Sequence, residues 1–144
     1  MKKQDLFDVV VKHALTMKSK SMDEFGNCSY RSHKNGACFI GVLINDNHYD
    51  KSLENKSIET KKVQRAVKDS GYKIIKKDIP FLLGLQSVHD NNYQSEGLSF
   101  VNKLYNDLIS FADLYDLKIK KKYNKKFKTK ISSMKALRKK ERAC

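Results

Sequence analysis

The sequence contains few of the residues that make turns, with one proline, Pro80, and six glycines in 144 residues. An all-β sandwich needs frequent turns, so this scarcity argues against one and favours helices. No apolar run approaches the roughly 18 residues that cross a membrane, and we therefore expect no membrane-spanning helix.

Cysteine is also scarce. Cys28, Cys38 and Cys144 are an odd number and lack the spacing of a disulfide scaffold, so we expect reduced thiols and a cytoplasmic location. Near the N-terminus, Asp5 and Asp8 interrupt what would be the apolar region of a signal peptide, and no such peptide is expected.

Apolar residues recur with the 3.6-residue period of amphipathic helices in several segments. The predicted helices cover residues 3–17, 57–70, 79–90 and 98–117. Gly71 follows the second helix in the position of a C′ glycine. Asp78 is the predicted N-cap of the third helix, with Pro80 in its first turn.

A small β-hairpin is predicted near residues 27–44. Asn35-Gly36 is a strong turn signal because both residues tolerate positive φ. Residues 37–44 form either the second strand or a short buried helix, and the pattern does not decide between them. The predicted fold class is mainly α, with about five helices and this hairpin in a single α+β domain.

Acidic residues are almost absent from the C-terminal segment. Lys118–Cys144 carry thirteen Lys and Arg against the single acid Glu141, a net charge of +12, whereas the whole chain carries +14. The apolar residues of this segment fall within a ~120° arc of a helical wheel and predict a helix that continues the preceding one or folds back onto the body. They are Ile119, Tyr123, Phe127, Ile131, Met134 and Leu137. We therefore divide the chain into a globular domain, residues 1–117, and a basic helical arm, residues 118–144, whose removal should leave the fold intact.

A nearly neutral body with a strongly basic segment is typical of a chain that binds a polyanion. The partners expected are DNA or RNA, or a host ribonucleoprotein or nucleic-acid enzyme; an acidic protein and a membrane surface are alternatives. Lysines suit phosphate attraction better than base reading. The predicted nucleic-acid-binding residues are Lys118, Lys120, Lys121, Lys122, Lys125, Lys126, Lys128, Lys130, Lys135, Arg138, Lys139, Lys140 and Arg142. Tyr123 and Phe127 could stack on bases, although their helical spacing favours packing in the core.

A second group of residues carries a resemblance. The pattern consists of Cys28-x-Tyr30-Arg31, then Cys38-x-x-Gly41-x-Leu43-Ile44-x-Asp46 with Tyr49, and Leu85-Gln86-x-x-His89-Asp90. It resembles small bacterial and phage proteins of unassigned activity, over roughly residues 4–91. The resemblance implies a prokaryotic or phage origin and a cytosolic protein, and it implies no mechanism. The basic segment after Leu117 departs from that pattern.

The same residues suggest a pocket for a nucleotide or another small molecule, because a guanidinium fork fits phosphate and an aromatic face can stack a base. The candidate pocket residues are Tyr30, Arg31, Asp46, Gln86, His89 and Asp90. The alternative is an Arg31–Asp46 or Arg31–Asp90 pair that closes the hairpin. His89 is either a histidine at a helix C-terminus or a general base, and His13 is interpreted as a core histidine.

The sequence contains few features that indicate a metal site or a catalytic site. Zinc could be held by Cys28 and Cys38 with His33, His48 or His89, but no Cys-x2–4-Cys pair occurs, so buried apolar cysteines are expected and no metal or cofactor. No complete catalytic motif is present, and no catalytic residue is assigned.

Together these observations predict a non-enzymatic phage or bacterial accessory protein. It would bind nucleic acid, or a host nucleic-acid machine, through its basic C-terminal arm in the cytoplasm, which is the host cytoplasm if a phage encodes it. The alternatives are a nucleotide-sequestering anti-defence protein and an inhibitor of a host enzyme.

Overall fold

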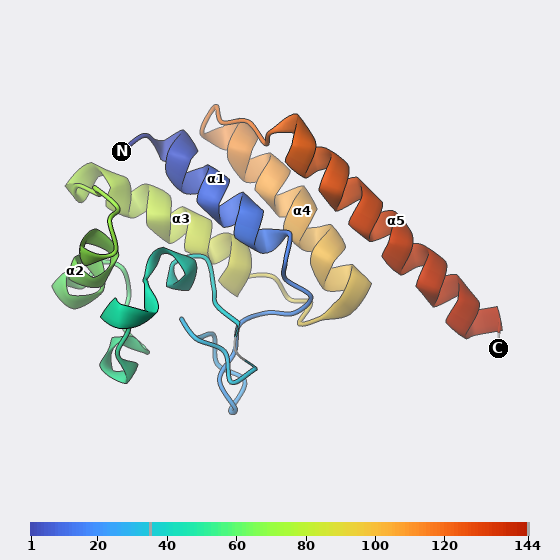
Figure 1. The fold of residues 1–144 in the computed structure, drawn as a ribbon, viewed down its shortest axis with the longest axis horizontal. Helices are drawn as coiled ribbons and strands as arrows, with labels where there is room; N and C mark the ends of the chain where they lie inside the picture. The colour runs from blue at the N-terminus through green and yellow to red at the C-terminus, as the bar shows by residue number, and fades with distance from the viewer. Residues whose placement is uncertain (35, 144) are drawn as a thin grey trace.

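The computed structural model describes residues 1–34 and 36–143, which are mainly helical (Figure 1). The prediction of a mainly α fold is confirmed. The α-helices of this part are α1 (Lys3–Ala14), α2 (Lys61–Asp69), α3 (Ile79–Asp90), α4 (Gly97–Leu114) and α5 (Lys121–Ala143). Short 3-10 turns lie at η1 (Gly41–Leu43), η2 (Asp46–His48), η3 (Lys51–Leu53) and η4 (Lys76–Asp78).

Four of the helices form the main body. In Figure 1, α4 and α5 run side by side in opposite directions, with α1 and α3 along the other side of α4. The Phe111 ring of α4 lies 6.0 Å from Phe7 of α1 and 5.4 Å from Phe81 of α3, measured between ring centroids. Burial of these rings and their aliphatic neighbours supplies the main stabilisation of the fold.

The predicted β-hairpin at residues 27–44 is wrong for the described residues, which contain only isolated bridges here, such as Arg31 with Ala37. The physical reason is that a glutamate side chain accepts hydrogen bonds from backbone N–H groups that would otherwise pair with a neighbouring strand. The Glu54 carboxylate accepts the N–H groups of Tyr30 at 2.8 Å and Arg31 at 3.1 Å. Residues 37–44 contain the η1 turn instead of a strand. The predicted Asn35-Gly36 turn includes Asn35, which lies outside the described residues.

The predicted helix ends are partly confirmed. Gly71 follows α2 with φ +102°, a left-handed conformation that glycine adopts without strain. Pro80 lies in the first turn of α3. Asp78 occupies the N-cap position of α3, as predicted, but its side chain does not cap the helix, because its carboxylate accepts the N–H of Ile75 at 2.8 Å. Among the helices described, none combines the length and apolar character needed to cross a bilayer.

Candidate nucleic-acid interface

The first half of α5 packs its apolar face against α4. Tyr123, Phe127 and Ile131 are buried. The Phe127 ring stacks on Tyr105 of α4, with ring centroids 4.7 Å apart. The Tyr105 hydroxyl donates a hydrogen bond to Asn124 Oδ1 at 2.7 Å. These aromatic rings therefore belong to the core, as their helical spacing favoured, and this half of the predicted arm is part of the body.

The link that precedes α5 is tied to α1. The Gln4 side chain accepts the backbone N–H of Lys118 at 3.0 Å and donates to the Lys118 carbonyl at 2.8 Å. One turn later on α1, Asp8 lies 3.3 Å from the Lys120 ammonium. Two of the predicted phosphate-binding positions thus also help to anchor the segment, and the charge of Lys120 has an acidic partner.

Lys130 is engaged with the protein itself. Its ammonium group donates to the carbonyls of Leu15 at 2.8 Å and Met17 at 2.6 Å, just beyond the end of α1. A cation is favourable there because the C-terminal carbonyls of a helix carry partial negative charge. Burial, with a smaller effect from nearby Lys18, lowers the pKa of Lys130. Lys130 therefore fixes α5 to the chain after α1 and is a poor candidate for phosphate contact.

The remaining basic side chains of the segment are exposed, and within residues 1–34 and 36–143 none of them forms an ion pair with a carboxylate. They are Lys118, Lys121, Lys122, Lys125, Lys126, Lys128, Lys135, Arg138, Lys139, Lys140 and Arg142. At 100° per residue, all of those in α5 except Arg138 fall on an arc of roughly 200° opposite Phe127. We call the exposed basic residues of α5, from Lys121 to Arg142 and including Arg138, the basic face of α5.

The end of α5 extends past the body (Figure 1). Met134 is the last residue partly buried against the core, and every residue from 135 to 143 is exposed. Leu137, which the sequence placed on the apolar stripe, is 59% exposed. A groove of about 400 Å³ separates Leu137 and Arg138 from the start of α4 at Gly97. Only this distal segment, residues 135–143, has the character of the predicted arm.

Arg31, one of the predicted pocket residues, forms hydrogen bonds to backbone carbonyls of the segment that contains η1. Its guanidinium donates to the carbonyls of Gly41 at 2.7 Å and Ile44 at 2.6 Å. It also lies 3.1 Å from Asp46, whose side chain is 96% exposed, so this ion pair adds little stability. The alternative interpretation of an Arg31–Asp46 pair is thus present in the structure. The carbonyl bonds occupy the donors that a bidentate phosphate contact would need.

The six candidate pocket residues do not line one cavity. Arg31 and Asp46 border a large cleft, whereas Tyr30, Gln86 and Asp90 line a separate cavity of about 240 Å³. His89 is completely buried. The Tyr30 hydroxyl donates to the carbonyl of Lys56, and Gln86 accepts the N–H of Ile40 at 2.8 Å while donating to Asp90 at 2.6 Å. These residues therefore bind segments of the fold to one another.

Cys28, His89 and Asp90 place their ligand atoms within 4.8 Å of one another. Both His89 nitrogens are occupied, because Nε2 accepts the N–H of Ser21 at 2.9 Å and Nδ1 donates to Asp90 at 2.8 Å. Burial and the nearby Asp90 carboxylate raise the pKa of Cys28, which keeps it a protonated thiol and a weak nucleophile. The arrangement is that of a hydrogen-bonded structural cluster.

The other residues weighed for zinc are elsewhere. Burial raises the pKa of Cys38 to about 12, and its Sγ accepts the N–H of Gly41 at 3.3 Å. His33 and His48 are exposed and do not belong to the cluster around Cys28. Cys144 lies outside the described residues. Cys38 thus fits the prediction of a buried apolar cysteine.

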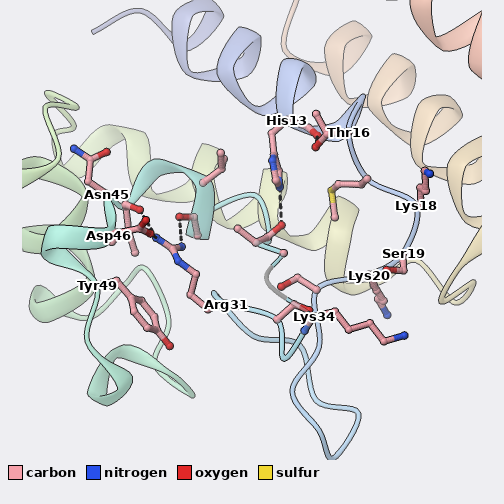
Figure 2. Close-up of a pocket in the computed structure, with 18 residues that line it drawn as sticks. His13, Thr16, Lys18, Ser19, Lys20, Arg31, Lys34, Asn45, Asp46 and Tyr49 are labelled. Carbon is pink, nitrogen blue, oxygen red and sulfur yellow. Dashed lines mark hydrogen bonds and ion pairs between the residues drawn. The ribbon is translucent and has the colours of Figure 1, made fainter.

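Sequence reasoning missed a large cleft of about 930 Å³ (Figure 2). Its walls come from the end of α1 with residues 16–21, from residues 31, 32, 34, 36 and 37, and from residues 41–49. Lys18, Lys20 and Lys34 line it. Each of these lysines lies in a short polar stretch without periodicity, so no local signal indicated that the fold would bring them to one cleft.

His13, at the edge of this cleft, provides a pH test of the fold. Burial lowers its pKa below 6.5, outweighing the opposite effect of its 2.6 Å hydrogen bond to the Ala37 carbonyl. The unfolded chain therefore binds a proton near pH 6.5 that the folded protein resists, and the free energy of unfolding should fall as the pH drops below that value. Urea denaturation of wild type and His13→Gln at about pH 7.5 and about pH 5.5 measures this. The variant should lose less stability on acidification, and equal losses would contradict the prediction.

No protein-family model, curated protein or solved structure matches this chain. The resemblance to small bacterial and phage proteins, drawn from the Cys28 to Asp90 pattern, stays a prediction.

Proposed function

We propose that this protein binds nucleic acid through the basic face of α5, as a non-enzymatic accessory protein of the cytoplasm. The observation that carries the proposal is the combination of charge and exposure. The basic face lacks carboxylate partners among the described residues, and the acidic residues of α5 are limited to Glu141. Cations held this way attract phosphates and release their condensed counterions, which is a favourable contribution to binding.

The dimensions of α5 suit a phosphate backbone. Its 23 residues correspond to a length of about 34 Å, close to one turn of a DNA duplex. The packed half fixes the direction of the helix, while the residues of the distal segment are exposed and can approach a groove or a strand. Because lysines predominate, the contact should be largely independent of sequence.

The buried polar groups favour binding over catalysis. Among the described residues, the thiols of Cys28 and Cys38 have raised pKa values, and both nitrogens of the fully buried His89 form hydrogen bonds within the protein. A nucleophile with an adjacent free base, which covalent catalysis requires, is not assembled from these residues.

The test replaces Lys135, Arg138, Lys139 and Lys140 with glutamine, because these exposed residues do not pack against the core. Affinity for a duplex and for a single strand is measured by fluorescence anisotropy over a range of salt concentrations. For every phosphate that the variant no longer neutralises, the log–log salt slope should decrease by about 1 and the affinity should fall several-fold. The melting temperature should be unchanged, since the side chains are exposed, and the circular dichroism should show no loss of helix.

A matched control removes the same four charges elsewhere, at Lys61, Lys68, Lys76 and Lys77, which are exposed around α2 and η4. In Figure 1 this region lies at the opposite end of the molecule from the distal segment. The control should retain most of the affinity. Equal losses in both variants would show that net charge alone matters, and an unchanged salt slope in the α5 variant would contradict the proposal.

A further inference from the structure

Most cations of the basic face of α5 form two rows along the helix. At 100° per residue, the rows lie roughly 140° apart around the helix axis. The first row repeats every seven residues, and all side chains of both rows are exposed. The first row is Lys121, Lys128, Lys135 and Arg142, and the second row is Lys122, Lys126 and Lys140. Each flank of the helix therefore carries its own line of positive charge.

Both rows face away from the body. Phe127, which stacks on Tyr105 of α4, lies on the side of the helix opposite the midline between the rows. In Figure 1, α4 runs along one side of α5, and no other described segment lies along its outer side in that view. Glu141 falls about 40° from Phe127 on the helical wheel and so interrupts neither row. A ligand on the outer side can therefore meet both rows at once.

The side chains between the rows are mostly short. Thr129, Ser132 and Ala136 are exposed there, with Lys125 further back along the helix and Lys139 beside the first row. In the distal half of α5, the helix axis can therefore come close to whatever surface lies between the two rows.

Two charged flanks match a groove that has a phosphate backbone on each side. An α-helix is about 10–12 Å across, and the major groove of B-form DNA is about 12 Å wide and admits one. A single strand has one phosphate backbone and meets one row at a time. The major groove of an RNA duplex is too deep and narrow to take a helix. A membrane surface is a poorer match, because the apolar face that would enter the lipid is buried against α4.

We propose that α5 lies in the major groove of a B-form DNA duplex, with one row of cations along each phosphate backbone. This inference rests on the proposed function, because it names the nucleic acid that the basic face of α5 binds and the way it is held. The rows contact phosphates, which carry no sequence information, so the selectivity is for the form of the nucleic acid.

The experiment measures binding of the full-length protein to three probes by fluorescence anisotropy: a DNA duplex of about 20 base pairs, an RNA duplex of the same sequence, and one DNA strand alone. At equal salt, the DNA duplex should bind at least about tenfold more tightly than either of the others. Contact with about six phosphates gives a log–log salt slope of about −5 for the duplex, and contact with about three gives about −2 for the single strand. An RNA duplex or a single strand that binds as tightly as the DNA duplex would overturn the inference.

Competition identifies the groove. Methyl green, a cation that occupies the major groove, should displace the protein from the DNA duplex. Netropsin, a cation that occupies the minor groove, should displace it much less at the same bound density. The reverse order would overturn the assignment to the major groove.

Two variants test whether both rows are used. One carries Lys128→Gln, Lys135→Gln and Arg142→Gln, and the other carries Lys122→Gln, Lys126→Gln and Lys140→Gln. Each should reduce the magnitude of the DNA-duplex slope by about 3, because each removes three phosphate contacts. A loss confined to one variant would show that a single row binds and would overturn the inference. The Lys122 ammonium also lies 5.0 Å from the centroid of the Tyr123 ring, so the melting temperature of the second variant is compared with that of wild type.

Failure of this inference is distinguishable from failure of the proposed function. If the variant with four glutamines in the distal segment loses affinity while the DNA duplex has no advantage over the single strand, α5 binds nucleic acid but does not lie in a groove. If that variant binds every probe as wild type does, the proposed function fails and this inference fails with it.

Discussion

Replacement of Phe127 with alanine is expected to lower the free energy of unfolding by about 3 to 5 kcal/mol, the cost of removing a buried aromatic side chain. Phe127 is completely buried and stacks on Tyr105 at 4.7 Å. The substitution would leave a cavity between α4 and α5 and remove the largest apolar side chain that α5 buries. Urea denaturation followed by circular dichroism measures the change.

Leu137→Ala provides the matched control in the same helix. Leu137 is 59% exposed, so its truncation should change the free energy of unfolding by less than about 1 kcal/mol. Similar losses in the two variants would contradict the packing described for α5. The same contrast applies to deletions, because removal of residues 118–144 would expose the core of α4. We therefore expect that only a deletion beginning at residue 135 leaves the fold intact.

Replacement of Gly41 with alanine is expected to cost at least about 3 kcal/mol, at the upper end of the usual overpacking penalties. A Cβ at this position would overlap the carbonyl oxygen of Tyr30 and lie 3.0 Å from its carbonyl carbon. That backbone cannot move freely, because the Tyr30 N–H is bound by Glu54 and the Gly41 carbonyl by Arg31. The melting temperature and the urea midpoint report the loss.

Gly36→Ala is the control for that substitution. A Cβ there would meet only the Ser32 side chain at 3.4 Å, an ordinary van der Waals contact. Its stability should stay within about 1 kcal/mol of wild type. A Gly41→Ala protein as stable as Gly36→Ala would show that the Tyr30 segment is looser than the structure indicates.

The helical body could be predicted from the sequence, because its signals are local. Leu6 and Val10 in α1, and Leu104 and Leu108 in α4, repeat at helical spacing and are completely buried. The same period in Tyr123 and its neighbours correctly indicated that α5 is a helix with one apolar face. What it could not indicate is that α4 covers this face, because periodicity defines a surface and not its partner.

The segment between α1 and α2 could not be predicted, because its shape depends on distant side chains. The Glu54 carboxylate accepts hydrogen bonds from the N–H groups of Tyr30 and Arg31. The Arg31 guanidinium donates hydrogen bonds to the carbonyls of Gly41 and Ile44. Contacts this far apart leave no periodic trace in the sequence. The Asn-Gly signal near residue 35 favoured a hairpin because turn rules consider only neighbouring residues.

The candidate sites were also predicted only in part from the sequence. Charge composition identified the basic residues of the C-terminal segment, because a count needs no structure. It could not show that the Lys130 ammonium group donates hydrogen bonds to the carbonyls of Leu15 and Met17. It also missed the cleft, since Lys20 and Lys34 become neighbours of one cavity only through folding.

The projecting tip of α5 has a consequence for how it meets a polyanion. Nine residues are too few to remain helical alone, and repulsion between like charges at i and i+4, such as Lys135 with Lys139 and Arg138 with Arg142, unwinds them further. The packed half supplies the helical nucleus, and the tip continues that helix to Ala143. An anion that lies along the tip cancels the repulsion and thereby winds the helix. If nucleic acid binds as proposed, ordering of the tip and binding of the ligand are coupled in a single equilibrium.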